Sequence, residues 1–299
     1  MSLLHGIIPP VPTILTSDFR FDRTGQARLL DRLIASGVNG VLMLGSGGEF
    51  CHLSAEMRCE VTEFAISHVA GRVPVLVGIG APGTLETIDL GRCAQKAGAT
   101  AVLVVNPYYV HLSERNLRLH YEQVARALDL PVMIYNFPAL TGQDMSAETV
   151  TALTRACENI VGMKDTVPEI AHTRQILLEV RQARPDFMVF PGFDEQILTG
   201  LALGVDGAIP AISNFAPQIV CGLYAAWQAG DFPKAIAMHR AIAALAPIYD
   251  IETPFFAVIK EAIRLTGLDI STAVMPPARP LSPEARAQVA QLLKAAHLL

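Results

Sequence analysis

The segment IVGMKDT, residues 160–166, is an apolar run that ends on a lysine. Its first residues are continuously apolar instead of alternating with polar ones, which is typical of a strand covered on both faces. Lys164 stands out because the chain has five lysines against eighteen arginines, and the other four do not directly follow such a run. The segment therefore predicts a buried parallel strand with an amine at its C-terminal end.

Seven further runs share this apolar character, and they span residues 7–15, 40–45, 74–80, 101–106, 131–136, 187–192 and 207–212. The clearest helical patterns between the runs cover residues 25–37, 54–70 and 113–129. The last two of these patterns begin on a serine, which is a preferred helix N-cap. Glycines at positions 37, 98 and 204 each follow a helical pattern shortly before the next run, as expected for helix C-caps.

Eight strands that are each followed by a helix, with no linker between them, predict an α/β fold of the (β/α)8 TIM-barrel type. We place this barrel at residues 1–229, a length that one barrel domain commonly reaches. From residue 230 the pattern is helical only. Residues 230–299 are therefore predicted to form a C-terminal helical extension packed on the barrel.

Composition excludes several classes of function. The net charge is −5 and no basic run is interleaved with aromatic residues, so the sequence predicts no nucleic-acid partner. No apolar stretch reaches the ~18 residues of a membrane span, and residues 1–10 lack the basic start of a secretory signal. Five scattered cysteines without a CxxC pair indicate reduced thiols in the cytoplasm. The eight histidines form no HxH or HExxH motif, so no metal is predicted, although a site built from distant histidines stays open.

In a TIM barrel the functional residues lie at the C-terminal ends of the strands. Five of the predicted strands end in polar or glycine-rich segments: GSGGE (45–49), NPYY (106–109), YNFP (135–138), KDT (164–166) and GFDE (192–195).

Each of these segments has a structural and a functional interpretation. Lys164 either reaches solvent or pairs with Asp165, or it is an amine in apolar surroundings that attacks a carbonyl group. Tyr135 either packs with its hydroxyl in water or relays protons beside such a lysine. The GSGGE segment is either a tight turn or a nest of backbone N–H groups that holds a carboxylate, with the Ser46 hydroxyl as a further donor.

The segment GIGAPG, residues 78–83, matches the GxGxxG pattern of dinucleotide-binding proteins. Such a site requires an acidic residue at the end of the next strand to bind the ribose, and Asn106 stands there instead. We therefore interpret these glycines as a tight turn of the barrel.

Four motifs in this order, GSGGE, NPYY, YNFPALTG and GMKDT, resemble those of the pyruvate-dependent class I aldolase family, which contains dihydrodipicolinate synthase and N-acetylneuraminate lyase. The segments LGSGGEF, NFPALTGQD, NFAPQ and TPFFAVIKEAI are most similar to bacterial 2-keto-3-deoxy-sugar-acid (gluconate or pentonate) aldolases. The resemblance implies a lysine–pyruvate imine and no other cofactor. It also implies a homotetramer built as a dimer of dimers.

The resemblance implies a role for each residue. Lys164 would be the Schiff-base lysine, Tyr135 the proton shuttle and Ser46 its relay partner, while the Ser46–Gly47 backbone would hold the pyruvate carboxylate. Tyr109 would reach into the site of a neighbouring subunit. By likeness to the sialic-acid lyase motif, sugar hydroxyls would be bound by Thr166, Asp194, Glu195 and Ser213. Gly48, Gly192 and Ile209 complete the expected substrate-binding set.

Two departures from the family pattern bear on the substrate. Dihydrodipicolinate synthase has an arginine where this chain has Leu140, and the loss of that carboxylate partner disfavours aspartate semialdehyde. Leu140 suits a neutral hydroxyaldehyde. Gly47 replaces the second hydroxyl of the usual TTGE segment, which weakens the proton relay.

The sequence therefore predicts a carbon–carbon lyase that cleaves a 2-keto-3-deoxy sugar acid to pyruvate and a hydroxyaldehyde. Two alternatives stay open. The first is a dihydrodipicolinate synthase, which condenses pyruvate with aspartate semialdehyde. The second is a non-enzymatic ligand-binding protein on the same barrel.

Overall fold

The structure is a computed structural model that describes residues 3–299, so the first two residues of the opening segment lie outside it. Its strands are β1 (Gly6–Ile7), β2 (Val41–Met43), β3 (Val75–Gly78), β4 (Ala101–Val105), β5 (Val132–Asn136), β6 (Ile160–Asp165), β7 (Met188–Pro191) and β8 (Gly207–Ala208). All eight predicted strands are present in the predicted order.

The strands close into a barrel. β2 to β7 form one parallel ladder in sequence order, and β1 pairs in parallel with β8. Backbone hydrogen bonds bridge the two remaining junctions: Val11 N–H donates to the Leu42 carbonyl at 2.8 Å, and Ile209 N–H donates to the Pro191 carbonyl at 3.0 Å. The (β/α)8 prediction is therefore confirmed.

The first and last strands are much shorter than the predicted runs 7–15 and 207–212. Pro9, Pro10 and Pro12 interrupt the first run, and Pro210 interrupts the last. A proline has no N–H to donate to a ladder, so regular pairing stops at Ile7 and Ala208. Our prediction of two long strands at these places was wrong because it weighed apolar character above this missing donor.

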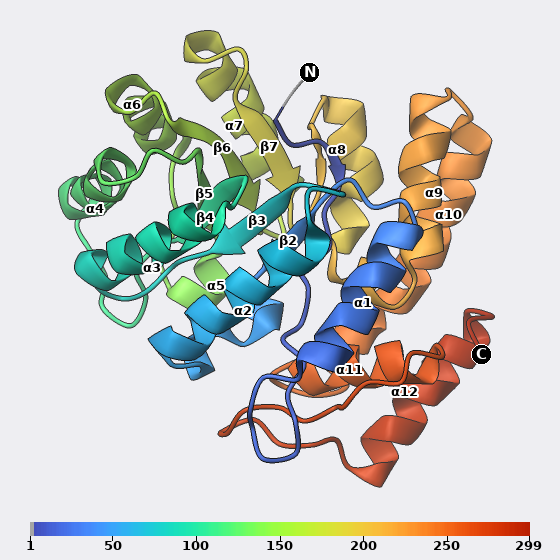
Figure 1. The fold of residues 1–299 in the computed structure, drawn as a ribbon. Coiled ribbons are helices and arrows are strands. Elements are labelled where there is room, and N and C mark those ends of the chain that lie inside the picture. Colours follow the sequence, from blue (N-terminus) through green and yellow to red (C-terminus); the bar gives the residue numbers. More distant parts are fainter. Residues whose placement is uncertain (1–2) are drawn as a thin grey trace.

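The helices surround the barrel and continue beyond it (Figure 1). They are α1 (Arg23–Ala35), α2 (Ala55–Val69), α3 (Thr84–Ala97), α4 (Glu114–Arg126), α5 (Pro138–Thr141), α6 (Ala147–Ala156), α7 (Ile170–Ala183), α8 (Ile197–Leu203), α9 (Pro217–Gln228), α10 (Phe232–Leu245), α11 (Phe256–Leu265) and α12 (Pro283–Ala295). Short 3₁₀ turns are η1 (Ser46–Gly48), η2 (Phe50–His52), η3 (Asp194–Gln196), η4 (Ala211–Asn214) and η5 (Ala246–Asp250).

Local sequence signals explain several helix ends. The Ser54 and Ser113 side chains accept hydrogen bonds from the backbone N–H of Met57 and Asn116, which confirms both predicted N-caps. Gly98 and Gly204 end α3 and α8 with φ of 93°, a left-handed conformation that favours glycine. These ends place each following strand directly after its helix.

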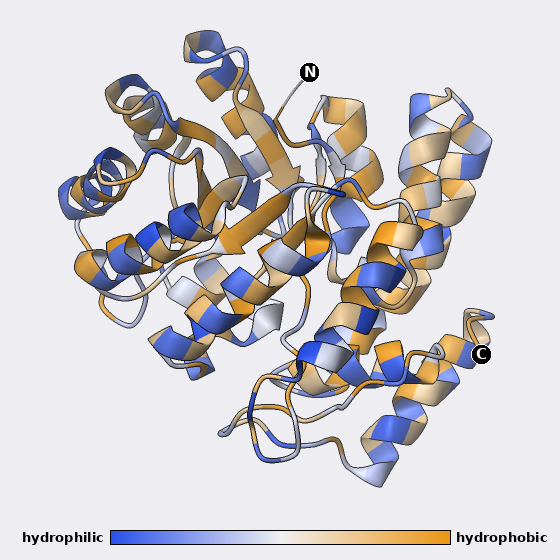
Figure 2. Cartoon of the chain, in the orientation of Figure 1, coloured by the Kyte–Doolittle hydropathy of each residue, from blue (hydrophilic) through white to orange (hydrophobic). Residues whose placement is uncertain are grey.

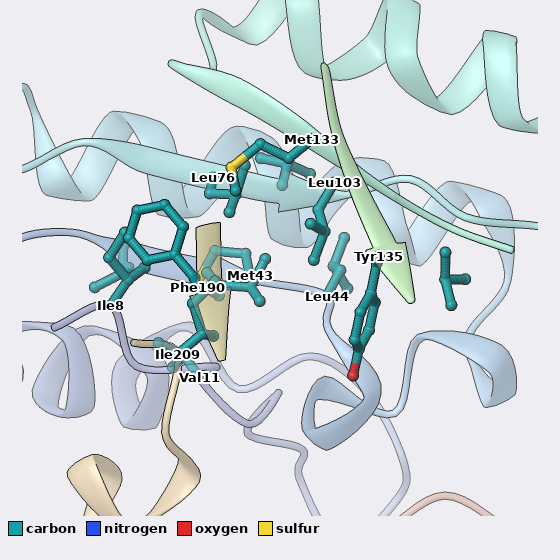
Figure 3. Close-up of a cluster of buried hydrophobic side chains, with 14 of the residues drawn as sticks. Ile8, Val11, Met43, Leu44, Leu76, Leu103, Met133, Tyr135, Phe190 and Ile209 are labelled. Carbon is teal, nitrogen blue, oxygen red and sulfur yellow. The ribbon is translucent and has the colours of Figure 1, made fainter. Parts of the chain in front are cut away.

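The strands are almost uniformly hydrophobic, whereas the helices carry polar residues toward solvent (Figure 2). Side chains from opposite strands fill the barrel, among them Met43, Leu76, Met133 and Phe190, which are fully buried (Figure 3). Tyr135 lies at the edge of this cluster, and its hydroxyl points away from it. The interior is thus a packed core, and the space for chemistry lies at its end.

The C-terminal helices α10, α11 and α12 follow the barrel without a strand between them. α10 packs beside α9, and α11 packs against α12 (Figure 1). The Arg32 side chain of α1 donates to the Phe215 carbonyl and to the Thr266 hydroxyl, both at 3.0 Å, and so ties the extension to the barrel. A division at residue 230 stays a prediction. Among residues 3–299, no helix combines the length and the apolar character needed to cross a bilayer.

Candidate active site

A cavity of about 210 Å³ lies at the C-terminal ends of the barrel strands. Of the residues predicted from sequence, it is lined by Ser46, Gly47, Tyr135, Lys164, Thr166, Gly192, Asp194 and Ile209. They come from the ends of β2, β5, β6, β7 and β8, so the barrel brings together side chains that are far apart in the sequence.

Lys164 is 4% exposed and points into this cavity. Its Nζ lies 4.3 Å from the centroid of the Tyr135 ring. Residues 3–299 place no carboxylate oxygen within ion-pair distance of this amine. Asp165, the next residue along the strand, faces the opposite side of the sheet and is hydrogen-bonded there to His172 and Thr173. The amine is therefore not engaged by Asp165.

Tyr135 is held next to Lys164 because the two residues are register partners of β5 and β6. Its hydroxyl lies 3.2 Å from the Ser46 hydroxyl, close enough for a hydrogen bond. An amine, a phenol and a serine hydroxyl thus lie next to one another on one side of the cavity. Such a set can hand a proton from one oxygen to the next.

The turn that carries Ser46 has an unusual backbone. Leu44 before it and Glu49 after it have φ of 57° and 60°, both in the left-handed region. The Glu49 side chain is fully buried and forms an ion pair with the equally buried Lys260 of α11. Burial lowers the pKa of Lys260, and the charge of Glu49 opposes that shift. The turn is therefore anchored to the C-terminal extension.

Thr166 and Gly192 shape the floor beside the lysine. The Thr166 hydroxyl is buried, and residues 3–299 provide it with no hydrogen-bond partner. A Cβ atom at position 192 would clash with this hydroxyl and would lie 3.1 Å from Lys164 Cε. A larger residue at position 192 would therefore force Thr166 to move and would crowd Lys164.

Asp194 lines the cavity but is already hydrogen-bonded. The Tyr249 hydroxyl donates to its Oδ2 at 2.6 Å, and the Ile212 N–H donates to its Oδ1 at 3.0 Å. Burial raises the pKa of this carboxyl to about 6, against the lowering effect of these hydrogen bonds. Asp194 therefore connects the end of β7 to the C-terminal extension.

Several other predicted site residues lie away from the cavity lining. Gly48 is buried behind it, where its carbonyl accepts from Thr13 at 2.7 Å. Ser213 donates to the Pro210 carbonyl in its own turn, and Glu195 is exposed on the surface. The structure does not bring these three side chains to Lys164, and their proposed contacts with substrate stay predictions.

Tyr109 and Leu140 lie on the surface of the chain, 96% and 58% exposed. Tyr109 has φ of 77°, which lies in the left-handed region. Neither residue lines the cavity of its own chain. The predicted role of Tyr109 in a neighbouring subunit is not tested by a single chain.

Sequence reasoning missed four aromatic residues that line the cavity: Phe137, Phe193, Tyr249 and Phe255. Tyr249 and Phe255 come from the segment between α10 and α11, and their rings contact each other at 5.7 Å between centroids. The segment IYDIETPFF concentrates aromatic residues between two helical patterns, a local feature that draws attention to the segment but does not indicate that it reaches the cavity.

Two of the three glycines of GIGAPG, Gly78 and Gly80, are required by close packing. A Cβ atom at Gly78 would clash with the Leu44 carbonyl, and one at Gly80 would clash with the Val105 side chain. Arg58 donates to the Gly80 carbonyl at 2.9 Å, so this loop is filled from within the chain. These contacts agree with the tight-turn interpretation. Residues 3–299 contain no group of three histidine, cysteine or acidic side chains arranged to hold a metal ion.

A second polar network lies behind the strand ends, on the outer face of the sheet. Asn136 and Asp165 are register partners directly after Tyr135 and Lys164. The Asn136 amide donates to Asp165 at 3.2 Å, and the His172 ring lies 2.9 Å from the same carboxylate. Burial disfavours the charged ring, but the hydrogen bond to Asp165 and the charges of Asp165 and Asp144 outweigh it and raise the pKa of His172 to about 9.

His172→Asn should therefore reduce stability most at low pH. The folded protein binds the His172 proton more tightly than the unfolded chain, whose histidine pKa is near 6.5. The stabilisation is fully present below about pH 6.5 and is lost as pH rises through about 9. Melting temperatures of the wild type and the variant at pH 6, 7.5 and 9.5 should converge toward high pH. A difference that does not change with pH would contradict this expectation.

The sequence was also compared with known proteins. The model of the Dihydrodipicolinate synthetase family matches residues 3–296. The protein named "Putative 2-dehydro-3-deoxy-D-gluconate aldolase YagE" of Escherichia coli K12 is 49% identical over 98% of this chain and 97% of its own length. "Probable 2-dehydro-3-deoxy-D-pentonate aldolase YjhH" of the same strain is 43% identical over 100% of this chain and 99% of its own length.

The solved structures agree on the fold. The crystal structure of YagE from E. coli K12 in complex with pyruvate superposes with a TM-score of 0.97 at 48% identity, covering 99% of both chains. Dihydrodipicolinate synthase from Aquifex aeolicus superposes with a TM-score of 0.92 at 31% identity, covering 98% of both chains.

Proposed function

The chain belongs to the dihydrodipicolinate synthetase family, and we propose that it is a class I aldolase that cleaves a 2-keto-3-deoxy sugar acid to pyruvate and a hydroxyaldehyde. The observation that carries this proposal is the buried Lys164 amine at the end of β6, which is beside Tyr135 and has no carboxylate partner within residues 3–299. Such an amine is suited to form an imine with a keto group.

The proposed reaction begins when Lys164 Nζ attacks C2 of the keto acid. Tyr135 donates its proton to the carbinolamine hydroxyl, which leaves as water, so that a protonated imine and a Tyr135 phenolate are formed. The protonated imine withdraws electrons from the C3–C4 bond. Tyr135 takes the proton of the C4 hydroxyl, the C3–C4 bond breaks, and the aldehyde leaves. The bonding electrons remain on C3 as an enamine. Protonation of C3 and addition of water to the imine release pyruvate and restore the lysine.

The remaining residues support these steps. Ser46 lies within hydrogen-bond distance of Tyr135 and would return the proton along the same path. The backbone N–H groups at Ser46 and Gly47, at the cavity wall, would hold the pyruvate carboxylate. The protonated imine is the electron sink, so the proposed reaction uses no cofactor beyond this covalent bond.

The synthase alternative is weaker. Leu140 replaces the arginine expected for aspartate semialdehyde, and none of the residues 3–299 that line the cavity is an arginine. The two E. coli relatives carry aldolase names and match almost the whole chain. Both points favour cleavage of a sugar acid with a neutral aldehyde half.

We further propose a homotetramer in the cytoplasm. Tyr109, Val110 and Leu140 are large apolar or aromatic side chains that a single chain leaves exposed. A neighbouring subunit would cover them and receive Tyr109 near its own Lys164. All five cysteines are free, as is usual in a reducing compartment.

The proposal is tested by incubating the protein with pyruvate and sodium borohydride, followed by intact-mass analysis and peptide mapping. We expect one reduced pyruvyl group per chain, located on Lys164, and no modification when pyruvate is left out. A folded sample that forms no adduct, or forms it on another lysine, would overturn the proposal and leave the ligand-binding alternative.

A further inference from the structure

The cavity holds few charges. Its lining within residues 3–299 includes one amine, Lys164, and one carboxylate, Asp194. When the aldehyde leaves or adds, the Lys164 nitrogen is part of an uncharged enamine, so the aldehyde half of the substrate shares the cavity with Asp194 and no other charged side chain. This distribution limits the charge that the aldehyde half can carry.

Tyr249 lies beside Asp194 and presents a hydrogen-bond acceptor to the cavity. A phenol has one proton, and the Tyr249 proton is donated to Asp194 at 2.6 Å. Burial and the nearby Asp194 charge raise the pKa of Tyr249 well above its usual value, so the proton stays on its oxygen. The lone pairs that remain on the Tyr249 oxygen are acceptors only, and so are those of Asp194.

These residues are part of a continuous wall, which we call the extension wall and define as Asp194, Tyr249 and Phe255. The Phe255 ring contacts Tyr249 edge to face, and its Cε2 atom would lie 3.5 Å from a Cβ atom at Gly47. The wall therefore runs from the expected carboxylate nest to the end of β7. All three side chains line the cavity.

We propose that Tyr249 is a specificity-determining residue that accepts a hydrogen bond from a hydroxyl of the aldehyde half, and that the extension wall restricts this half to uncharged hydroxyaldehydes. This inference rests on the proposed aldolase function. A hydroxyl can donate to the Tyr249 oxygen, whereas a carboxylate or phosphate oxygen is only an acceptor. An anionic aldehyde would leave buried acceptors unpaired and would meet the Asp194 charge.

The experiment uses the condensation direction with two aldehydes of equal carbon number, glycolaldehyde and glyoxylate. They differ in carrying a hydroxymethyl group or a carboxylate. In both reactions C3 of the enamine bonds to the aldehyde carbon, the aldehyde oxygen takes a proton, and water releases the product from Lys164. The value of kcat/KM is measured for each aldehyde at saturating pyruvate.

We expect the wild type to favour glycolaldehyde by on the order of 10²-fold or more. Tyr249→Phe should lower kcat/KM for glycolaldehyde roughly tenfold, the effect of one hydrogen bond, and change the glyoxylate value little. Asp194→Asn removes the charge and keeps one acceptor oxygen for the two donors, Tyr249 and the Ile212 N–H, so it should raise the glyoxylate value. Tyr224→Phe, a half-buried tyrosine of α9 away from the cavity, is the matched control.

Formation of the pyruvate adduct distinguishes a failure of this inference from a failure of the proposed function. Each variant is first trapped with pyruvate and borohydride, which shows that it is folded and that Lys164 reacts. If the adduct forms but Tyr249→Phe lowers both aldehydes equally, or Asp194→Asn leaves their ratio unchanged, the wall does not select the aldehyde and this inference is wrong. If the wild type forms no adduct, the proposed function fails and this inference fails with it.

Discussion

Lys164→Ala should reduce pyruvate formation by roughly 10⁴- to 10⁶-fold, the range seen when residues of a catalytic unit are removed from other enzymes. The substituted chain has no amine in the cavity, so neither the imine nor the enamine can form. Release of pyruvate from 2-keto-3-deoxygluconate is followed with a coupled assay, and borohydride trapping is run on the same samples.

Two further variants make this result specific. Lys164→Met keeps an apolar side chain of similar length in the buried position and should be equally inactive, which excludes a packing effect. Lys96→Ala removes an exposed lysine of α3 and should keep full activity. Pyruvate formation by Lys164→Ala at the wild-type level would show that another group performs the chemistry.

The fold was predictable where strands are buried on both faces. The runs at 101–106, 131–136 and 160–165 agree with β4, β5 and β6 to within one residue, because continuous burial requires continuous apolar character. The first and last runs are equally apolar, but their prolines cannot donate to a ladder. Apolar patterning therefore predicts that a segment is buried, and hydrogen-bonding capacity decides whether it is a strand.

The site residues that lie near strand ends could be predicted from the sequence. Lys164, Tyr135 and Ser46 lie at or directly after strand ends, and barrel geometry brings such residues together. Tyr249 and Phe255 could not be found in this way, because they lie between helices and reach the cavity through tertiary contacts. The bond from Tyr249 to Asp194 spans 55 residues, and no local pattern marks it.

The ion pair between Glu49 and Lys260 could not be predicted from local sequence patterns either, because the two residues are 211 positions apart. Lys260→Met should destabilise the protein by about 3–5 kcal/mol, because it leaves the Glu49 carboxylate buried and uncompensated. For a chain of this size that corresponds to a fall in melting temperature of roughly 5–8 °C. Thermal unfolding followed by circular dichroism measures it. Lys294→Met, at an exposed position of α12, is the matched control and should melt with the wild type.

The double variant Glu49→Gln/Lys260→Met tests the cause. It removes both charges, and the glutamine oxygen can still accept from the Met275 N–H, which lies 2.7 Å from Glu49 in the wild type. Because a buried charge costs most when it is alone, the double variant should melt above Lys260→Met. If it melts no higher, the lone Glu49 carboxylate is not the cause of the loss, because both variants lack Lys260 and differ only at position 49. The Glu49 turn also carries Ser46, so we expect Lys260→Met to raise the KM for pyruvate in condensation, as the carboxylate nest loses its anchor.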